Sequence, residues 1–307
     1  MNENNPVEKV SIKKVLWVSF VVNILDVITG VVVAALTGSV IMLAQALEGI
    51  TDLASSGLLL LGLSRSRKEA DSSHPFGYGR ELYFWTLISA LIMLSITSTF
   101  TFYFGLQRFL HPEVIQSTYL AYIVLIFTAI TNSYALSLSV RRLLKGRSIN
   151  SLAKSFYHSS FIETKTSFVL DLMGFSASIL GLISLSLYTI TGNQRFDGFG
   201  AMVIGIFLAI LSVILLSAVK DFLIGRGVSI NTTEIIKNAA ERLTHVKSVQ
   251  DLKASHIGPE EIMINIEINA ADNLTTDELE VLIDKVKGEI QKDLPSAKHI
   301  QVELESQ

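Results

Sequence analysis

Six apolar stretches, each long enough to cross a membrane as a helix, dominate this chain of 307 residues. They lie near residues 15–36, 40–63, 83–106, 118–140, 166–189 and 199–219. A helix needs roughly 20 residues to cross the hydrocarbon core of a bilayer, so each stretch fits one crossing. The mean hydropathy of +0.47 is far above the value that a soluble domain needs for its core. The sequence therefore predicts an all-α six-helix transmembrane bundle over residues 15–220, with the lipid bilayer as a partner.

Positive charge is concentrated in two of the connections between these stretches. The basic residues are Arg65, Arg67, Lys68 and Arg80 in the first connection, and Arg141, Arg142, Lys145, Arg147 and Lys154 in the second. Because cytoplasmic loops carry an excess of Lys and Arg, we expect both connections and both termini in the cytoplasm. Residues 1–14 are polar and lack a signal-peptide cleavage pattern, so we interpret them as a cytoplasmic segment. The small size and the lack of a targeting-peptide pattern lead us to expect a prokaryotic cytoplasmic (inner) membrane, and an organelle membrane is the alternative.

The composition changes after about residue 220, where hydropathy falls and charged residues become dense. Apolar residues alternate at Ile262, Ile264, Ile266 and Ile268, which is the period of a strand with one buried face. The expected elements are a helix over 232–246, strands over 246–258 and 260–270, a helix over 275–294 and a strand over 299–305. Residues 221–307 are therefore predicted to form a small α+β (αββαβ) cytoplasmic domain.

The charge and cysteine content exclude several kinds of chemistry. The chain has no Cys, which rules out disulfides, thiol catalysis and Cys-rich zinc sites. A net charge of -3 gives no basic bias toward nucleic acid. No nucleophile elbow or Gly-rich phosphate loop occurs in the apolar stretches, so an intramembrane enzyme is a poor interpretation. Any chemistry must come from Asp, Glu, His and hydroxyl groups.

Two carboxylates interrupt the second apolar stretch, at Glu48 and Asp52. A carboxylate at the middle of a membrane helix costs about 2.5–3.5 kcal/mol to insert and is kept only beside partners, water or an ion. Residues four apart lie on one helix face, where two like charges repel unless a cation or protons neutralise them. Ser167 and Asp171 repeat this spacing in the fifth stretch, one turn after Glu163. Together these residues can form a divalent metal site. The alternative is that each acid only hydrogen bonds a neighbouring helix.

With these residues, the sequence resembles the cation diffusion facilitator family over nearly its whole length. GSVIMLAQALEGITD resembles the family's second helix, HPFGYGRELYFW its His-Pro-Phe/Tyr-Gly loop, and Asp171 with the small residues after it the fifth helix. The αββαβ tail resembles the family's cytoplasmic domain. The resemblance implies a homodimeric secondary transporter that exports divalent metal in exchange for protons by alternating access, with no permanent cofactor. It implies a transport site at Glu48, Asp52, Ser167 and Asp171.

The proposed site departs from the pattern of zinc-exporting members at two positions. Many of those members have His or Asp where this chain has Glu48, and His where it has Ser167. The remaining donors are oxygen atoms, which favour Mn²⁺ or Fe²⁺ over Zn²⁺. Asp26, in the first stretch, and Glu163 are further candidates as residues of the cavity or the proton path, and either Glu163 or water is expected to complete the metal ligands.

The sequence gives weaker support for metal sites outside the bundle. Asp71 and His74 form a candidate loop site, but Tyr78 stands where the family often has a second His. A tight turn that uses Gly77 and Gly79 is the other interpretation of this loop. In the soluble domain, the positions where zinc-binding members cluster ligands carry Gln250, Ile266, Glu280, Glu303 and Glu305, and His245, His256 and His299 are scattered. A binuclear zinc cluster is therefore not expected in that domain.

A second function, from another class, is a scaffold or partner subunit that keeps the body of a transporter without transport. The loss of the imidazole ligands supports this alternative. Retention of Glu48, Asp52 and Asp171 argues against it, because an inactive bundle gains stability by replacing all three with apolar residues. Proton-coupled metal uptake into vesicles by the purified chain separates the two hypotheses.

Overall fold

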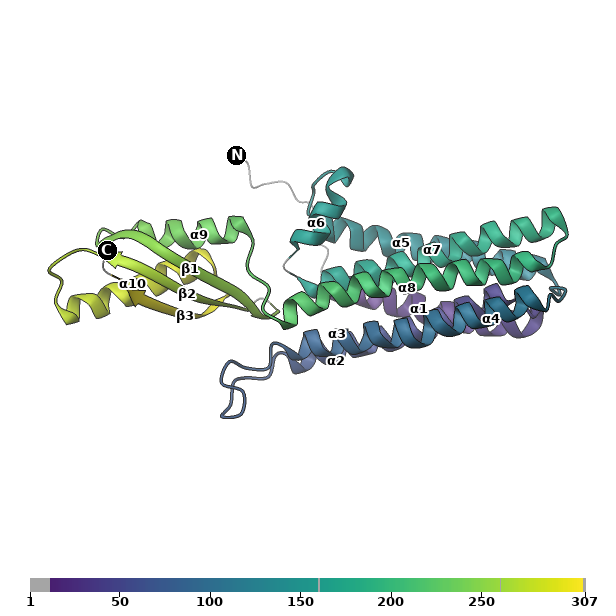
Figure 1. The fold of residues 1–307 in the computed structure, drawn as a ribbon, viewed down its shortest axis with the longest axis horizontal. Helices are drawn as coiled ribbons and strands as arrows, with labels where there is room; N and C mark the ends of the chain where they lie inside the picture. The colour runs from purple at the N-terminus through teal and green to yellow at the C-terminus, as the bar shows by residue number, and fades with distance from the viewer. Residues whose placement is uncertain (1–11, 160, 260, 306–307) are drawn as a thin grey trace. The chain divides into compact units, whose positions relative to one another are not determined.

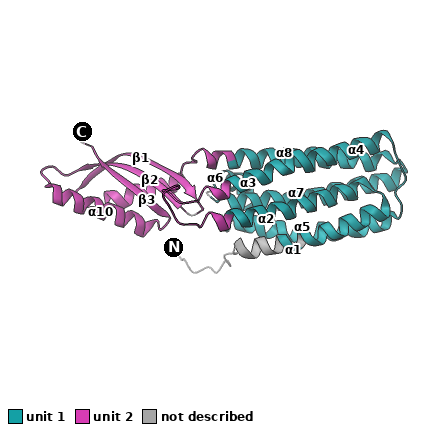
Figure 2. Cartoon of the chain, turned by 90° about the horizontal axis from the view of Figure 1, so that it is seen from below, with its two compact units in different colours: residues 1–62, 84–219 teal, residues 63–83, 220–307 magenta. Residues whose placement is uncertain are grey.

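The computed structural model describes residues 12–159, 161–259 and 261–305 (Figure 1). The chain divides into two compact units, shown in Figure 2. Unit 1 holds residues 1–62 and 84–219, and unit 2 holds residues 63–83 and 220–307. The loop between the second and third predicted spans therefore packs with the C-terminal residues rather than with the helices that it joins.

Unit 1 is built from long apolar helices that lie side by side (Figures 1 and 2). The helices are α1 (Ile12–Thr37), α2 (Val40–Arg65), α3 (Glu81–Ile92), α4 (Thr99–Leu110), α5 (Thr118–Leu144), α6 (Leu152–His158), α7 (Ile162–Thr191) and α8 (Arg195–Leu223). A π-helical segment, Met93–Ser98, joins α3 to α4, so residues 81–110 form one span. Short α6 is an element that the sequence did not predict.

Among the described residues, five helices are long and apolar enough to cross a membrane. They are Val40–Arg65, Glu81–Leu110, Thr118–Leu144, Ile162–Thr191 and Arg195–Leu223. The prediction of a helical membrane domain is confirmed. The first predicted span, 15–36, lies in α1, where the stretch Asn23–Thr37 counts as a shorter apolar helix. The count of six spans therefore stays a prediction.

The start of α2 is held by a side chain from α8. Asp197 is fully buried, and its carboxylate accepts hydrogen bonds from Ser39 Oγ at 2.7 Å and from the backbone N–H of Val40 at 3.0 Å. Arg108, at the end of α4, lies 3.6 Å from the same carboxylate and also donates to the Gly38 carbonyl. The first N–H groups of a helix lack partners within the helix, so the carboxylate of Asp197 caps α2 from outside. This contact fixes α2 against α8 and α4.

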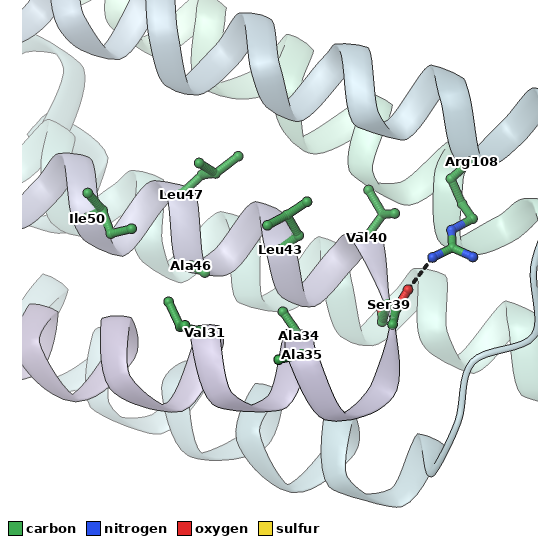
Figure 3. A pocket seen from close by; sticks show the side chains of 11 residues that line it. Val31, Ala34, Ala35, Ser39, Val40, Leu43, Ala46, Leu47, Ile50 and Arg108 are labelled. Carbon is green, nitrogen blue, oxygen red and sulfur yellow. Dashed lines mark hydrogen bonds between the residues drawn. The ribbon is translucent and has the colours of Figure 1, made fainter.

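An apolar pocket of about 420 Å³ lies beside this contact (Figure 3). Its walls come from α1 and α2, with Arg108 at one end. The lining residues are Val31, Ala34, Ala35, Gly38, Ser39, Val40, Leu43, Ala46, Leu47, Ile50 and Arg108. None of the predicted metal ligands lines this pocket.

Unit 2 contains the predicted small α+β domain. Its elements are α9 (Ile230–Glu241), β1 (Val246–Gly258), β2 (Glu261–Ala270), α10 (Thr276–Asp293) and β3 (Ala297–Leu304). The sheet order is β1-β2-β3, with β1 antiparallel to β2 and β3 parallel to it. Alternate isoleucines of β2 are buried with Leu282, Val286 and Ile290 of α10. The αββαβ order is therefore confirmed, and the period-two pattern of β2 is what places one face of the sheet in the core.

Candidate functional site

The two acids of α2 lie together in the interior of the bundle. Glu48 is 2% exposed and Asp52 is 3% exposed, and the two carboxyl groups interact electrostatically. Their four-residue spacing brings them onto adjacent turns of one helix face. Glu48 Oε1 and Asp52 Oδ1 are buried without a hydrogen-bond partner within the part of the chain that the structure describes. Two buried carboxyl groups on adjacent turns must share a proton or attract a cation.

The acid of α7 faces the same region. Asp171 is buried, and it accepts a hydrogen bond from Ser139 Oγ of α5. The charge of Asp171 acts on both Glu48 and Asp52. Ser167, one turn earlier on α7, is also buried, and its hydroxyl has no hydrogen-bond partner among the described residues. The three predicted acids of α2 and α7 are thus within electrostatic reach of one another.

A fourth acid, Asp26 of α1, belongs to this group through α5. Asn132 donates a hydrogen bond from Nδ2 to Asp26 Oδ2 at 2.7 Å, and both side chains are buried. The charge of Asp26 also acts on Glu48 and Asp52. Sequence reasoning missed Asn132, although a polar amide at membrane depth in the fourth span was a usable signal.

A glycine of α7 makes room for these side chains. A Cβ atom at Gly174 would lie 2.5 Å from Asn132 Oδ1 and 3.2 Å from Glu48 Oε1. The first distance is shorter than any ordinary contact, so Asn132 and a larger residue at position 174 exclude each other. Gly174 therefore lets α7 approach the polar side chains of α2 and α5 closely.

The described residues contain no group of three or more His, Cys, Asp or Glu side chains already arranged to hold a metal ion. The acids of α1, α2 and α7 share one buried region, but their oxygen atoms do not converge on a common point. A metal ion that binds them must draw the carboxyl groups together. Such movement is compatible with an ion that is bound and then released rather than held permanently.

Glu163 of α7 pairs with a basic residue of α5. It is 6% exposed, and its carboxylate is 3.9 Å from Arg142 Nη2. Arg142 also donates from Nε to Thr164 Oγ1 at 2.9 Å. The contact with Arg142 ties the start of α7 to the end of α5. Glu163 is placed at the first turn of α7, where an acid also interacts favourably with the helix dipole.

The loop candidate Asp71 is exposed and is saturated by donors of its own loop. Its carboxylate accepts hydrogen bonds from Ser73 Oγ at 2.6 Å, Tyr78 Oη at 2.8 Å and Lys68 Nζ at 3.1 Å. Backbone N–H groups of Ser73 and His74 also donate to it. Ser73, followed by Tyr78 and Lys68, holds the pKa of Asp71 well below its usual range. The ammonium group of Lys68 thus already supplies a positive charge at this carboxylate.

The His74 side chain is less involved in this network. Its Nδ1 atom lies 3.0 Å from Ser73 Oγ and 3.8 Å from Asp71 Oδ1. The imidazole ring stacks at a tilt against the Tyr78 ring, with 4.1 Å between the centroids. Gly77 has a φ of 77°, so the tight turn that was the alternative interpretation of this loop is present.

The open face of the sheet in unit 2 carries acids on neighbouring strands. Asp251 of β1 pairs in register with Glu267 of β2, and Glu267 pairs with Glu303 of β3. A hydrogen bond and like charge from Glu305 raise the pKa of Glu267. Lys253, which forms an ion pair with Asp251 at 2.7 Å, offsets part of this negative charge.

His256 and His299 of unit 2 contact different aromatic rings. His256 is 6% exposed and packs near Phe222, with 5.9 Å between the ring centroids. The His299 ring meets the edge of Phe76 from the loop at 5.3 Å. These two histidines therefore pack with aromatic rings in different places, and they are scattered as the sequence predicts.

Two domain families of cation efflux proteins match this chain. The cation efflux transmembrane domain matches residues 16–223, and the cytoplasmic domain of cation efflux proteins matches residues 230–307. The human protein named proton-coupled zinc antiporter SLC30A9, mitochondrial, is 27% identical over 267 residues, which make up 86% of this chain and 47% of that protein. The chain spans about half the length of this curated relative.

Two further similarities cover different parts of the chain. Cation-efflux pump FieF of Klebsiella pneumoniae is 24% identical over 261 residues, which cover 85% of this chain and 82% of the pump. A solved structure of the MamM C-terminal domain in a nickel form covers 26% of this chain and 99% of its own, with 22% identity and a TM-score of 0.25. The transmembrane match alone extends over more than half of the sequence. The chain belongs to the cation diffusion facilitator family.

Proposed function

We propose that this chain exports divalent metal ions from the cytoplasm in exchange for protons. The observation that carries the proposal is the buried carboxyl pair Glu48 and Asp52, which has no ion pair with Lys, Arg or His among the described residues. Two further acids, Asp26 and Asp171, act on this pair with like charge. Burying four acids in an apolar bundle is costly unless protons or a cation neutralise them.

The proposed metal ligands are Glu48 and Asp52 of α2 with Ser167 and Asp171 of α7. Oxygen donors on two different helices let a change in the spacing between the helices open and close the site, which is the basis for alternating access. Asp26 interacts electrostatically with Glu48 and Asp52, and we assign it a role as proton acceptor. Glu163, which pairs with Arg142, is assigned to the cytoplasmic end of the path rather than to the metal.

Metal and proton compete for the same oxygen atoms in this mechanism. A carboxylate binds a metal ion only after it has lost its proton, so loading of the metal releases protons and reprotonation expels the metal. This competition couples the two fluxes without a further cofactor. The name of the human relative, a proton-coupled zinc antiporter, is consistent with such coupling.

The proposed site does not select for Zn²⁺. Ser167 supplies a hydroxyl where an imidazole would favour Zn²⁺, and the other three ligands are carboxylates. An all-oxygen site favours Mn²⁺ and Fe²⁺, although Zn²⁺ can also bind it. We therefore propose Mn²⁺ or Fe²⁺ as the preferred substrate and Zn²⁺ as a weaker one.

The remaining parts of the proposal concern organisation. Residues 15–220 act as the transport domain, and residues 221–307 join two copies into a homodimer, as the match to the cytoplasmic domain of cation efflux proteins supports. Both termini lie in the cytoplasm, in keeping with the basic loops. We place the protein in a prokaryotic cytoplasmic (inner) membrane.

The competing function is a transport-inactive scaffold or partner subunit. The purified chain, reconstituted alone into liposomes that contain a pH-sensitive dye, distinguishes the two. A manganese gradient should drive proton movement that requires the protein and stops when the gradient is removed. Protein-dependent proton movement that is absent with Mn²⁺, Fe²⁺ and Zn²⁺ alike would favour the scaffold.

A further inference from the structure

The connection between α5 and α7 has a charge of one sign. Residues 141–161 contain no Asp or Glu. Their basic residues are Arg141, Arg142, Lys145, Arg147 and Lys154. Because α5 and α7 are both apolar helices of membrane-spanning length, the segment that joins them must lie at a membrane surface. The segment therefore presents a basic surface at the depth of lipid headgroups.

The short helix α6 is fixed on the bundle by its inner face. Phe156 is 9% exposed and packs on Phe168 of α7, with 5.8 Å between the ring centroids. The backbone carbonyl of Tyr157 accepts a hydrogen bond from Lys165 Nζ at 3.3 Å. Figure 1 shows α6 beside the ends of α5 and α7. These contacts define which face of α6 is turned outward.

The outer face of this connection is apolar and basic at once. Tyr157 is 69% exposed and Ile149 is 60% exposed, although both are large hydrophobic residues. Lys154 of α6 and Arg147 of the preceding segment are exposed beside them. Tyr is enriched where membrane meets water, and basic residues there attract anionic headgroups. Exposing these large apolar side chains to water would give no stabilisation, whereas burying them among lipid headgroups would.

We propose that residues 147–157 form a binding surface for anionic phospholipid, with Tyr157 and Ile149 inserted at the headgroup level and Arg147 and Lys154 bound to lipid phosphate. The single sign of charge and the amphipathic side chains both fit this partner. An acidic protein would complement the charge, but it would not by itself account for exposed Tyr and Ile next to two membrane helices. The proposal does not depend on metal transport.

Tryptophan fluorescence tests this surface in the full chain. In a background with Trp17→Phe and Trp85→Phe, the only Trp is introduced by Tyr157→Trp. The protein is reconstituted in mixtures of phosphatidylcholine with brominated phosphatidylglycerol or brominated phosphatidylcholine, because bromine quenches only nearby Trp. Brominated phosphatidylglycerol should quench this Trp more strongly than brominated phosphatidylcholine at equal content. Val281→Trp, at an exposed position of α10, serves as the control and should be quenched by neither lipid.

Charge removal makes the test specific. Arg147→Gln and Lys154→Gln should each lower the preference for phosphatidylglycerol over phosphatidylcholine by roughly two- to fivefold, and high salt should do the same. Lys287→Gln on α10 should leave the preference unchanged. Equal quenching by the two lipids, unaffected by Arg147→Gln and Lys154→Gln, would overturn the assignment to anionic headgroups. Absence of quenching above the Val281→Trp control would overturn the surface itself and leave a protein partner as the explanation.

Discussion

The two candidate metal sites of this chain contain similar side chains in opposite surroundings. Glu48 and Asp52 are buried, each has one oxygen atom without a donor among the described residues, and neighbouring acids add negative charge. Asp71 is exposed and accepts hydrogen bonds from Ser73, Tyr78 and Lys68. A cation would therefore neutralise negative charge at the buried pair that no donor of the described residues offsets, whereas the charge of Asp71 is already offset by its own loop.

From this comparison we infer that a motif residue can become a metal ligand only if its oxygen atoms are left available. Lys68 and Tyr78 satisfy Asp71 from within the loop, so a metal ion would have to displace an ammonium group and a hydroxyl. Glu48 and Asp52 offer oxygen atoms that no donor of the described chain occupies. We therefore expect substitutions in the two regions to have very different effects.

Removal of one charge from each region gives the largest expected difference. Asp52→Asn and Asp171→Asn should each lower metal-driven proton flux in proteoliposomes by about 100-fold or more, because too few charged oxygens remain to replace the hydration shell of the ion. Asp71→Asn, an equal change in an exposed loop, should leave the flux close to that of wild type. Wild-type flux in Asp52→Asn or Asp171→Asn would remove the assigned site.

Acid should weaken metal binding at the buried site. Each proton that the metal displaces from a carboxyl group makes the apparent affinity fall by about tenfold per pH unit over the range in which that group still carries a proton. Calorimetry of manganese binding in buffers with different ionisation enthalpies measures the number of protons released. Binding heats that do not depend on the buffer would exclude proton exchange at the site.

Restoring an imidazole should change the selectivity of the buried site several-fold. Ser167→His places a nitrogen ligand one turn from Asp171 and should raise the zinc-to-manganese ratio of transport. Ser159→His, at a position that precedes α7, is a matched control that should leave the ratio unchanged. If the ratio in Ser167→His is unchanged or lower, position 167 does not contact the metal.

The smallest effect is expected in the loop of Asp71, and it should not require a metal ion. Tyr78→Phe removes one donor from Asp71, so the pKa of Asp71 should rise toward its usual value and backbone amides of residues 68–78 should exchange faster. In wild type, the lowered pKa of Asp71 keeps the carboxylate charged and the loop protected down to a pH below about 3.9, with protection lost only as pH falls further. Hydrogen exchange measured by mass spectrometry follows both effects. Loop protection that depends on added zinc and not on Tyr78 would contradict this view.

Much of the fold could be predicted from the sequence because each helix or strand carries its own hydrophobic pattern. The apolar lengths of α2, α5, α7 and α8 and the alternating isoleucines of β2 are local properties, and each element lies where its pattern predicts. Short α6 escaped prediction because seven residues are too few to show a period, and its place depends on Phe156 packing against α7.

The candidate site was predictable only in part. The spacing of Glu48 and Asp52 identified the α2 pair, since helix geometry alone brings residues four apart together. The contact of Asn132 with Asp26 joins α5 to α1, and the space at Gly174 depends on α7. Such contacts arise from the packing of several helices. The donors around Asp71 likewise come from the path of a whole loop, which spacing does not specify.

Manganese binding to the purified protein tests the central claim most directly. Equilibrium dialysis with radiolabelled manganese should show that wild type and Asp71→Asn retain the ion equally, and that Asp52→Asn loses it. Binding that survives in Asp52→Asn but is lost in Asp71→Asn would place the metal in the loop and contradict a transport site between α2 and α7.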